Sequence, residues 1–149
     1  MVGLVLACAP IGGWAAVTGR LELVPLLLGG AVLFWVAGFD IIYSCQDAAF
    51  DRKAGLHSLP VRVGVGRALQ LSTLLHLLSV FLLLGVGFWG SLGTFFWVGW
   101  GIVSMILLSE HRLISPTDLS RVNQAFFVMN GWVGVILFVA VFVDRVWMR

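Results

Sequence analysis

Hydrophobic residues occupy 60% of the 149 positions and charged residues only 11%, whereas about a quarter of an average soluble domain is charged. A soluble fold of this size could not bury so much apolar surface, so the composition predicts a membrane protein. The net charge of +2 is small and the basic residues are scattered between apolar runs, which argues against a nucleic-acid partner. Two cysteines, Cys8 and Cys45, provide neither a disulfide framework nor a zinc-ligand spacing.

Apolar runs of membrane-spanning length recur along the chain. Hydropathy predicts five spans, which in chain order cover residues 2–17, 24–42, 68–88, 92–108 and 126–143. Each should be a helix, because a helix satisfies its own backbone hydrogen bonds in lipid. The sequence therefore predicts an all-α fold, a polytopic transmembrane bundle of about five helices.

The connections between the spans differ in length and charge. Residues 46–67 and 109–125 form two long loops, and the short turns contain only Arg20. The two loops hold most of the basic residues: Arg52, Lys53, Arg62, Arg67, Arg112 and Arg121. By the positive-inside rule we expect both loops on the cytoplasmic side of the inner (cytoplasmic) membrane, with the N-terminus inside and the C-terminus outside.

The most informative segment covers residues 39–60 and reads FDIIYSCQDAAFDRKAGLHSLP. If it were one helix turning 100° per residue, four polar residues would lie on one stripe at about 0°, −60°, −20° and +20°. They are Asp40, Tyr43, Asp47 and Asp51. One helix face would then present three carboxylates and the only tyrosine of the chain.

Three carboxylates on one stripe are costly without a ligand. An Asp near the bilayer centre costs about 2.5 to 3.5 kcal/mol, and like charges one helical turn apart repel. A hard divalent cation removes both penalties, and Mg²⁺ is usually held by one or two carboxylates plus substrate phosphates. The basic residues that follow could contact the phosphates. The pattern predicts a Mg²⁺-diphosphate site at the membrane surface. The alternative is a solvated helix end whose charges only set topology.

The extended pattern is more specific than its aspartates alone. Read as D-x-x-Y-x-x-x-D-x-x-x-D-x-x-x-G-x-x-S, it resembles the second aspartate-rich motif of the UbiA family of intramembrane prenyltransferases, nearest to the 4-hydroxybenzoate polyprenyltransferase branch. The matching residues are Asp40, Tyr43, Asp47, Asp51, Gly55 and Ser58. The segments APIGGWAAVTG at 9–19 and EHRLISPTDLSRVNQAFF at 110–127 also resemble this branch, so the resemblance covers nearly the whole chain.

The resemblance implies a nine-helix bundle in which two aspartate-rich motifs hold Mg²⁺ against a polyprenyl diphosphate. The prenyl group would pass to an aromatic acid acceptor such as 4-hydroxybenzoate, in ubiquinone or menaquinone biosynthesis. By this resemblance Asp47 and Asp51 would bind the metal, and Asp40 and Tyr43 would be catalytic residues near the acceptor or the allylic group. The candidate substrate-binding residues are Arg52, Lys53, His57 and Ser58.

The family's first motif, N-D-x-x-x-D, is absent from the 149 residues. Since the five spans resemble the fifth to ninth helices of the family bundle, we expect residues 1–149 to form the C-terminal part of a UbiA-type transmembrane domain, with a missing N-terminal half as partner. The absent motif also suits an inactive half-bundle or a membrane interaction partner. A CDP-alcohol phosphotransferase is less favoured, because no D-G-x-x-A-R element precedes Asp47.

The remaining ionisable residues are expected to have no shared role. The other acidic residues should be isolated: Glu22, Glu110, Asp118 and Asp144. His76 and His111 should be packing or interfacial residues rather than ligands.

Overall fold

The apolar runs form long helices joined by shorter ones in the computed structural model, which describes residues 2–124 and 130–147. In chain order the helices are α1 (Val2–Thr18), α2 (Leu23–Ser44), α3 (Ala48–Lys53), α4 (Leu59–Val63), α5 (Val65–Trp89), α6 (Thr94–Leu113), α7 (Val122–Gln124) and α8 (Asn130–Val146). The described residues contain no β-strand, only an isolated bridge between Ser115 and Asp118. The predicted all-α fold is confirmed.

The predicted spans correspond closely to the long helices. The first four match α1, α2, α5 and α6, and α8 covers residues 130–143 of the fifth, whose start lies outside the described residues. By length and composition, α2 and α5 could cross a membrane, and α1 is a shorter apolar helix.

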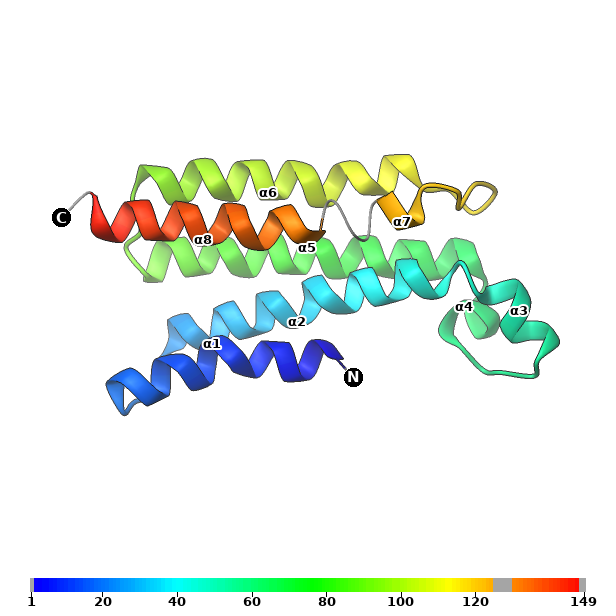
Figure 1. Ribbon diagram of the computed structural model, residues 1–149, viewed down its shortest axis with the longest axis horizontal. Coiled ribbons are helices and arrows are strands. Elements are labelled where there is room, and N and C mark those ends of the chain that lie inside the picture. Colours follow the sequence, from blue (N-terminus) through cyan, green and yellow to red (C-terminus); the bar gives the residue numbers. More distant parts are fainter. Residues whose placement is uncertain (1, 125–129, 148–149) are drawn as a thin grey trace.

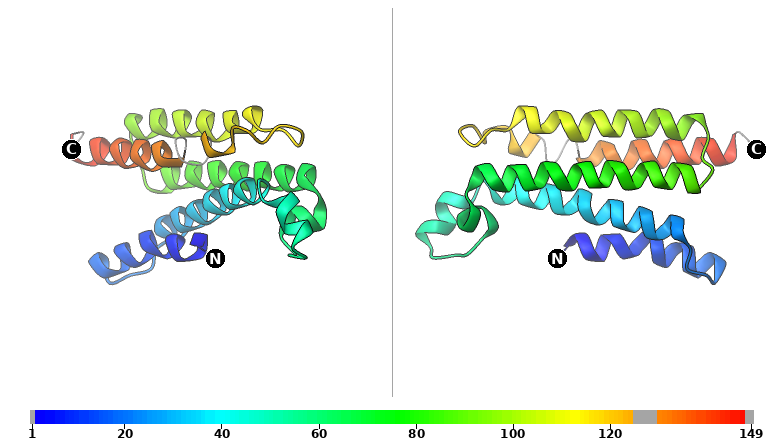
Figure 2. Two further views of the ribbon diagram at one scale, coloured as in Figure 1. Left: turned by 45° about the vertical axis from the view of Figure 1, so that its right-hand side comes forward. Right: turned by 180° about the vertical axis from the view of Figure 1, so that it is seen from behind.

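Each long helix runs antiparallel to the next one along the chain (Figures 1 and 2). Helix α2 packs against α1 and α5, and α6 packs against α5 and α8. Because of this order, both long connections lie at one end of the bundle, whereas the α1–α2 and α5–α6 turns and the C-terminal end of α8 lie at the other (Figure 1). The predicted placement of the two long loops at a common end is confirmed, and their cytoplasmic location stays a prediction.

Small and hydroxyl side chains bring α2 and α5 close together. Ser72 and Ser79 of α5 donate hydrogen bonds to the backbone carbonyls of Gly38 and Ala31 of α2, both at 2.8 Å. Membrane helices pack closely through such residues, because apolar side chains gain little by leaving lipid for a neighbouring helix. The α2–α5 pair therefore forms the centre of the bundle.

The carboxylate of Asp144 in α8 joins that helix to the start of α6. It accepts hydrogen bonds from the backbone N–H groups of Phe95 at 3.1 Å and Phe96 at 3.0 Å. These N–H groups belong to the first turn of α6 and have no partner within the helix. The neighbouring Arg145 donates to the Gly90 carbonyl at 2.6 Å. The expectation that Asp144 is isolated is wrong, because the antiparallel packing of α6 and α8 brings it to a helix terminus.

Candidate active site

The aspartate-rich segment is not one continuous helix. Helix α2 ends at Ser44, residues 45–47 form a turn, and α3 starts at Ala48. The N–H of Cys45 contacts the carbonyls of both Ile41 and Ile42, and the N–H of Gln46 donates to Tyr43 at 3.1 Å. Such short-range bonds tighten the last helical turn and stop its propagation. The single stripe through Asp51 is therefore wrong, and the calculated angles apply only within α2.

Within α2, Asp40 and Tyr43 lie on a face turned away from α5. Asp40 is exposed and Tyr43 is 39% exposed, whereas the adjacent Phe39 and Ile42 are buried. The helix thus buries its apolar side and presents a carboxylate and a phenol near its C-terminal end. The two candidate catalytic residues share one helix face, as the sequence predicts.

Asp47 and Asp51 lie one turn apart across the start of α3. The N–H of Asp51 donates to the backbone carbonyl of Asp47 at 2.8 Å, and Asp47 is exposed while Asp51 is half-buried. No described basic side chain forms an ion pair with either carboxylate or with Asp40. Their negative charge is therefore not compensated by the described part of the chain. Two carboxylates one helical turn apart offer the oxygen ligands that Mg²⁺ prefers.

The segment after α3 turns back through Gly55. This glycine has a φ of 70°, and the N–H of Leu56 donates to the Asp51 carbonyl at 2.8 Å, which is the bonding pattern of a Schellman helix end. A side chain at this φ would be strained, so the glycine of the motif has a backbone role. It ends α3 directly after Arg52 and Lys53, which are both exposed.

The remaining candidate substrate-binding residues follow this turn. His57 is exposed, and Ser58 is the residue preceding α4. The Oγ atom of Ser58 is buried and has no hydrogen-bond partner among the described residues. A buried hydroxyl without a partner is destabilising, so a ligand oxygen at this position would relieve the cost. All eight predicted site residues thus lie at the end of α2 or in the loop that follows it.

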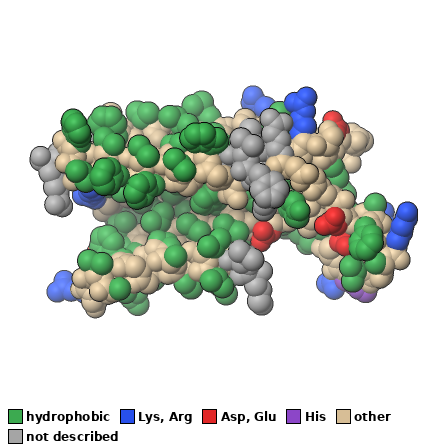
Figure 3. Space-filling model, in the orientation of Figure 1, with side chains coloured by type: hydrophobic (Ala, Val, Ile, Leu, Met, Phe, Trp, Pro, Cys, Tyr) green, Lys and Arg blue, Asp and Glu red, His purple; other side chains and the backbone are tan. Residues whose placement is uncertain are grey.

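Charge and apolar surface are segregated on the visible face of the molecule. Figure 3 shows acidic, basic and histidine side chains gathered around the end that carries α3 and α4, a few basic side chains at the opposite end, and mainly hydrophobic side chains between. A groove of about 670 Å³ lies toward the opposite end, between α1 and α2 on one side and α8 on the other. Its apolar lining includes Trp14, Pro25, Leu83 and Phe138. The molecule therefore combines a polar end with an apolar groove.

One buried polar group was missed by the sequence interpretation. Glu110 is not isolated, because α5 and α6 pack side by side and place its carboxylate 2.5 Å from His76. The available signal was His76, an ionisable residue within a predicted span, which is unusual enough in a membrane to suggest a specific partner. Glu110 lies in the predicted loop 109–125, where a charged residue gives no such signal.

Comparisons with known proteins identify the family of this chain. The model of the UbiA prenyltransferase family matches residues 1–142. The chain belongs to the UbiA prenyltransferase family. Together with the apolar helices α2 and α5, this membership identifies a membrane protein.

Similar UbiA-related proteins carry 4-hydroxybenzoate prenyltransferase names. A 4-hydroxybenzoate octaprenyltransferase of Aromatoleum aromaticum is 31% identical over 134 residues, 90% of this chain and 45% of the relative. The octaprenyltransferase of Chromohalobacter salexigens is 32% identical, over 85% of this chain and 42% of the relative. A 4-hydroxybenzoate solanesyltransferase of Synechocystis is 33% identical, over 83% and 42%. The chain therefore spans less than half the length of these relatives, and no solved structure matches it.

Proposed function

We propose that this chain forms part of a Mg²⁺-dependent enzyme that transfers a polyprenyl group from polyprenyl diphosphate to an aromatic acid such as 4-hydroxybenzoate, in ubiquinone or menaquinone biosynthesis. Family membership and the names of the relatives support the reaction class. The observation that carries the proposal is the pair of carboxylates at the α2–α3 junction, Asp47 and Asp51, which form no ion pair with a described residue and are followed at once by basic residues.

In this proposal Asp47 and Asp51 bind Mg²⁺, and Arg52, Lys53 and His57 contact the diphosphate oxygens. Exposed cations next to the metal-binding carboxylates can form charge-assisted hydrogen bonds with phosphate. The unpartnered Ser58 hydroxyl adds a neutral donor to the same loop. The bound Mg²⁺ would neutralise charge that develops on the departing diphosphate.

Asp40 and Tyr43 lie deeper on α2 and act on the prenyl and aromatic groups. A carboxylate near the allylic carbon stabilises the positive charge that develops as the diphosphate leaves. The apolar groove toward the opposite end of the bundle offers a surface for the prenyl chain, which extends away from its anchored diphosphate. Polar chemistry at one end and apolar binding along the helices together suit an amphiphilic substrate.

The wider arrangement is also a proposal. We place the α3–α4 loop on the cytoplasmic side of the inner membrane, because the two long loops at this end carry most of the basic residues. Residues 1–149 contribute the C-terminal part of the catalytic domain. The other aspartate-rich motif comes from an N-terminal half, in line with the share of the relatives that the chain covers.

The proposal is tested by single substitutions in the enzyme assembled with an N-terminal half from a close relative. Asp47→Asn and Asp51→Asn remove one anionic ligand each and should lower Mg²⁺-dependent transfer to 4-hydroxybenzoate at least 100-fold, since removing one stabilising group from an active site costs about 10²- to 10³-fold. Asp118→Asn alters an exposed carboxylate in the other long loop and should leave the rate unchanged. Near-normal transfer by both motif variants would contradict the assignment.

A further inference from the structure

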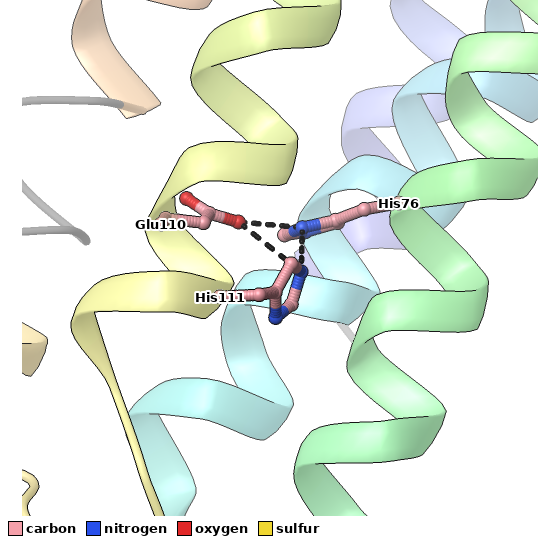
Figure 4. A group of neighbouring side chains, drawn as sticks. All are labelled: His76, Glu110 and His111. Carbon is pink, nitrogen blue, oxygen red and sulfur yellow. Dashed lines mark hydrogen bonds and ion pairs between the residues drawn. The ribbon is translucent and has the colours of Figure 1, made fainter.

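A group of titratable side chains lies inside the bundle, separate from the aspartate-rich loop. His76 of α5 and the adjacent Glu110 and His111 of α6 point toward one another (Figure 4). Nδ1 of His76 is 2.5 Å from Oε1 of Glu110 and 3.0 Å from Nε2 of His111, and the latter nitrogen is 3.7 Å from the same oxygen. The side chains of His76 and Glu110 are fully buried, and that of His111 is 13% exposed.

The outer contacts of the two imidazoles determine where their protons lie. Nε2 of His76 is 3.1 Å from the carbonyl oxygen of Trp35, which can only accept, so this nitrogen carries the proton. The Thr73 hydroxyl donates its single proton to the Leu69 carbonyl and therefore accepts from Nδ1 of His111, at 3.2 Å. In this tautomer both inward nitrogens carry lone pairs, although His76 also makes a hydrogen-bond contact with the backbone of Leu107.

Two imidazole nitrogens and one carboxylate oxygen thus face one another, at distances that require a proton or a metal ion between them. Neither carboxylate oxygen of Glu110 has a hydrogen-bond partner among the described residues. A buried carboxylate is strongly unfavourable unless a positive charge or several donors compensate it. Either a proton on Glu110 or a metal ion at the centre of the cluster would remove this cost.

We propose that His76, Glu110 and His111 form a binding site for a divalent transition-metal ion, with Zn²⁺ as the best match. Two imidazoles and one carboxylate are an established zinc ligand set, and imidazole donors do not suit Mg²⁺. Bonds of about 2.0 to 2.2 Å hold tetrahedral zinc ligands roughly 3.3 to 3.6 Å apart. The observed separations of 2.5, 3.0 and 3.7 Å lie on either side of this spacing.

The surroundings of the cluster match those of known metal sites. Metal-binding histidines typically donate their second N–H to a carbonyl or another acceptor, which fixes the tautomer and ring orientation. The Trp35 carbonyl accepts the second N–H of His76, and the Thr73 hydroxyl accepts that of His111. The partial exposure of His111 provides an entry for the ion from the polar end of α6.

A metal ion here would join three helices. It would bind α5 to α6 directly, and the His76–Trp35 contact would connect it to α2. The ring of His76 also contacts Phe39, the residue before Asp40, with ring centroids 4.9 Å apart. The ion would thus stabilise the buried side of α2, and the opposite, exposed side of α2 carries Asp40 and Tyr43. This inference does not depend on the proposed prenyl transfer.

The experiment measures metal bound to the full chain, purified in lipid nanodiscs without chelators or a histidine tag. Elemental analysis should find about one zinc per chain, and Co²⁺ added after zinc removal should give saturable visible absorption bands of a low-symmetry site. A millimolar excess of Mg²⁺ should not displace either ion. Zinc should also raise the melting temperature of the zinc-free protein.

Matched variants assign the ligands. Glu110→Gln and His111→Gln should lose zinc and the Co²⁺ bands, whereas Glu22→Gln and His57→Gln, which change exposed residues of the same types, should retain both. A chain carrying both Asp47→Asn and Asp51→Asn should also keep its zinc, which separates this site from the aspartate-rich loop. If a ligand variant does not fold, the proposal is tested by the Co²⁺ spectrum of the unsubstituted protein and by the rise in its melting temperature on zinc binding. Absence of both would show that a shared proton holds the cluster instead, and equal zinc retention by folded ligand variants and controls would show that the ion binds elsewhere; either result overturns the proposal.

Discussion

Gly38→Ala is a sharp test of how tightly α2 packs against α5. A Cβ atom at Gly38 would overlap Cδ2 and Nε2 of the His76 ring. The ring cannot move aside at low cost, because it is fully buried, its Nε2 contacts the Trp35 carbonyl and its Nδ1 contacts Glu110. Relief would require α2 and α5 to separate or the polar cluster to break.

The expected loss of stability is estimated by comparing Gly38 with a glycine whose Cβ position lies in open space. Adding a methyl group to a closely packed interior costs about 1 to 3 kcal/mol, whereas replacing a helical glycine with alanine by itself gains up to about 1 kcal/mol. At Gly101 of α6 a Cβ would meet no atom within 4 Å, so only the gain remains. The free energies of unfolding of Gly38→Ala and Gly101→Ala should therefore differ by about 1 to 3 kcal/mol.

Thermal unfolding of both variants in the same nanodiscs, followed by tryptophan fluorescence, measures this difference. For a chain of this size, each kcal/mol corresponds to about 2 to 4 °C, so Gly38→Ala should melt about 2 to 12 °C below Gly101→Ala. Equal melting temperatures for the two variants would refute the close contact between Gly38 and His76.

Two further predictions concern the loops and the helix ends. Asp144→Ala should lower the free energy of unfolding by about 1 to 2 kcal/mol, because two N–H groups at the start of α6 lose their acceptor; an unchanged melting temperature would argue against this cap. Cysteines introduced at Lys53 and Ser120 should react with an impermeant thiol reagent only from the cytoplasmic side, and one at Ser91 only from the other side. Labelling of positions 53 and 120 from opposite sides of the membrane would contradict the placement of the two long loops at the same end of the bundle.

The sequence predicted the helices well because their signal is local. Long apolar runs define α1, α2, α5 and α6 regardless of what they contact, and the charged segments between them define the loops. The break between α2 and α3 has no such signal. No proline or glycine lies near Cys45, and the helix ends through backbone contacts that only the folded loop determines.

The polar contacts between helices depend on tertiary structure. His76 and His111 are 35 positions apart, and Asp144 is 49 positions from Phe95. Of these residues only His76 is an ionisable residue within a predicted span, and the sequence gives no partner for it. Their contacts follow from the order in which α5, α6 and α8 pack. The aspartate-rich site was easier to predict because its residues lie within a single segment.

The most direct test of the central proposal compares membranes that contain this chain alone with membranes that also contain an N-terminal half carrying the N-D-x-x-x-D motif. One aspartate-rich segment supplies only part of the positive charge that a departing diphosphate needs, so the chain alone should transfer no prenyl group. The two halves together should prenylate 4-hydroxybenzoate in a Mg²⁺-dependent manner. Robust transfer by the 149-residue chain alone, or transfer by the combined halves that persists when Asp47 and Asp51 are both replaced by Asn, would contradict the account.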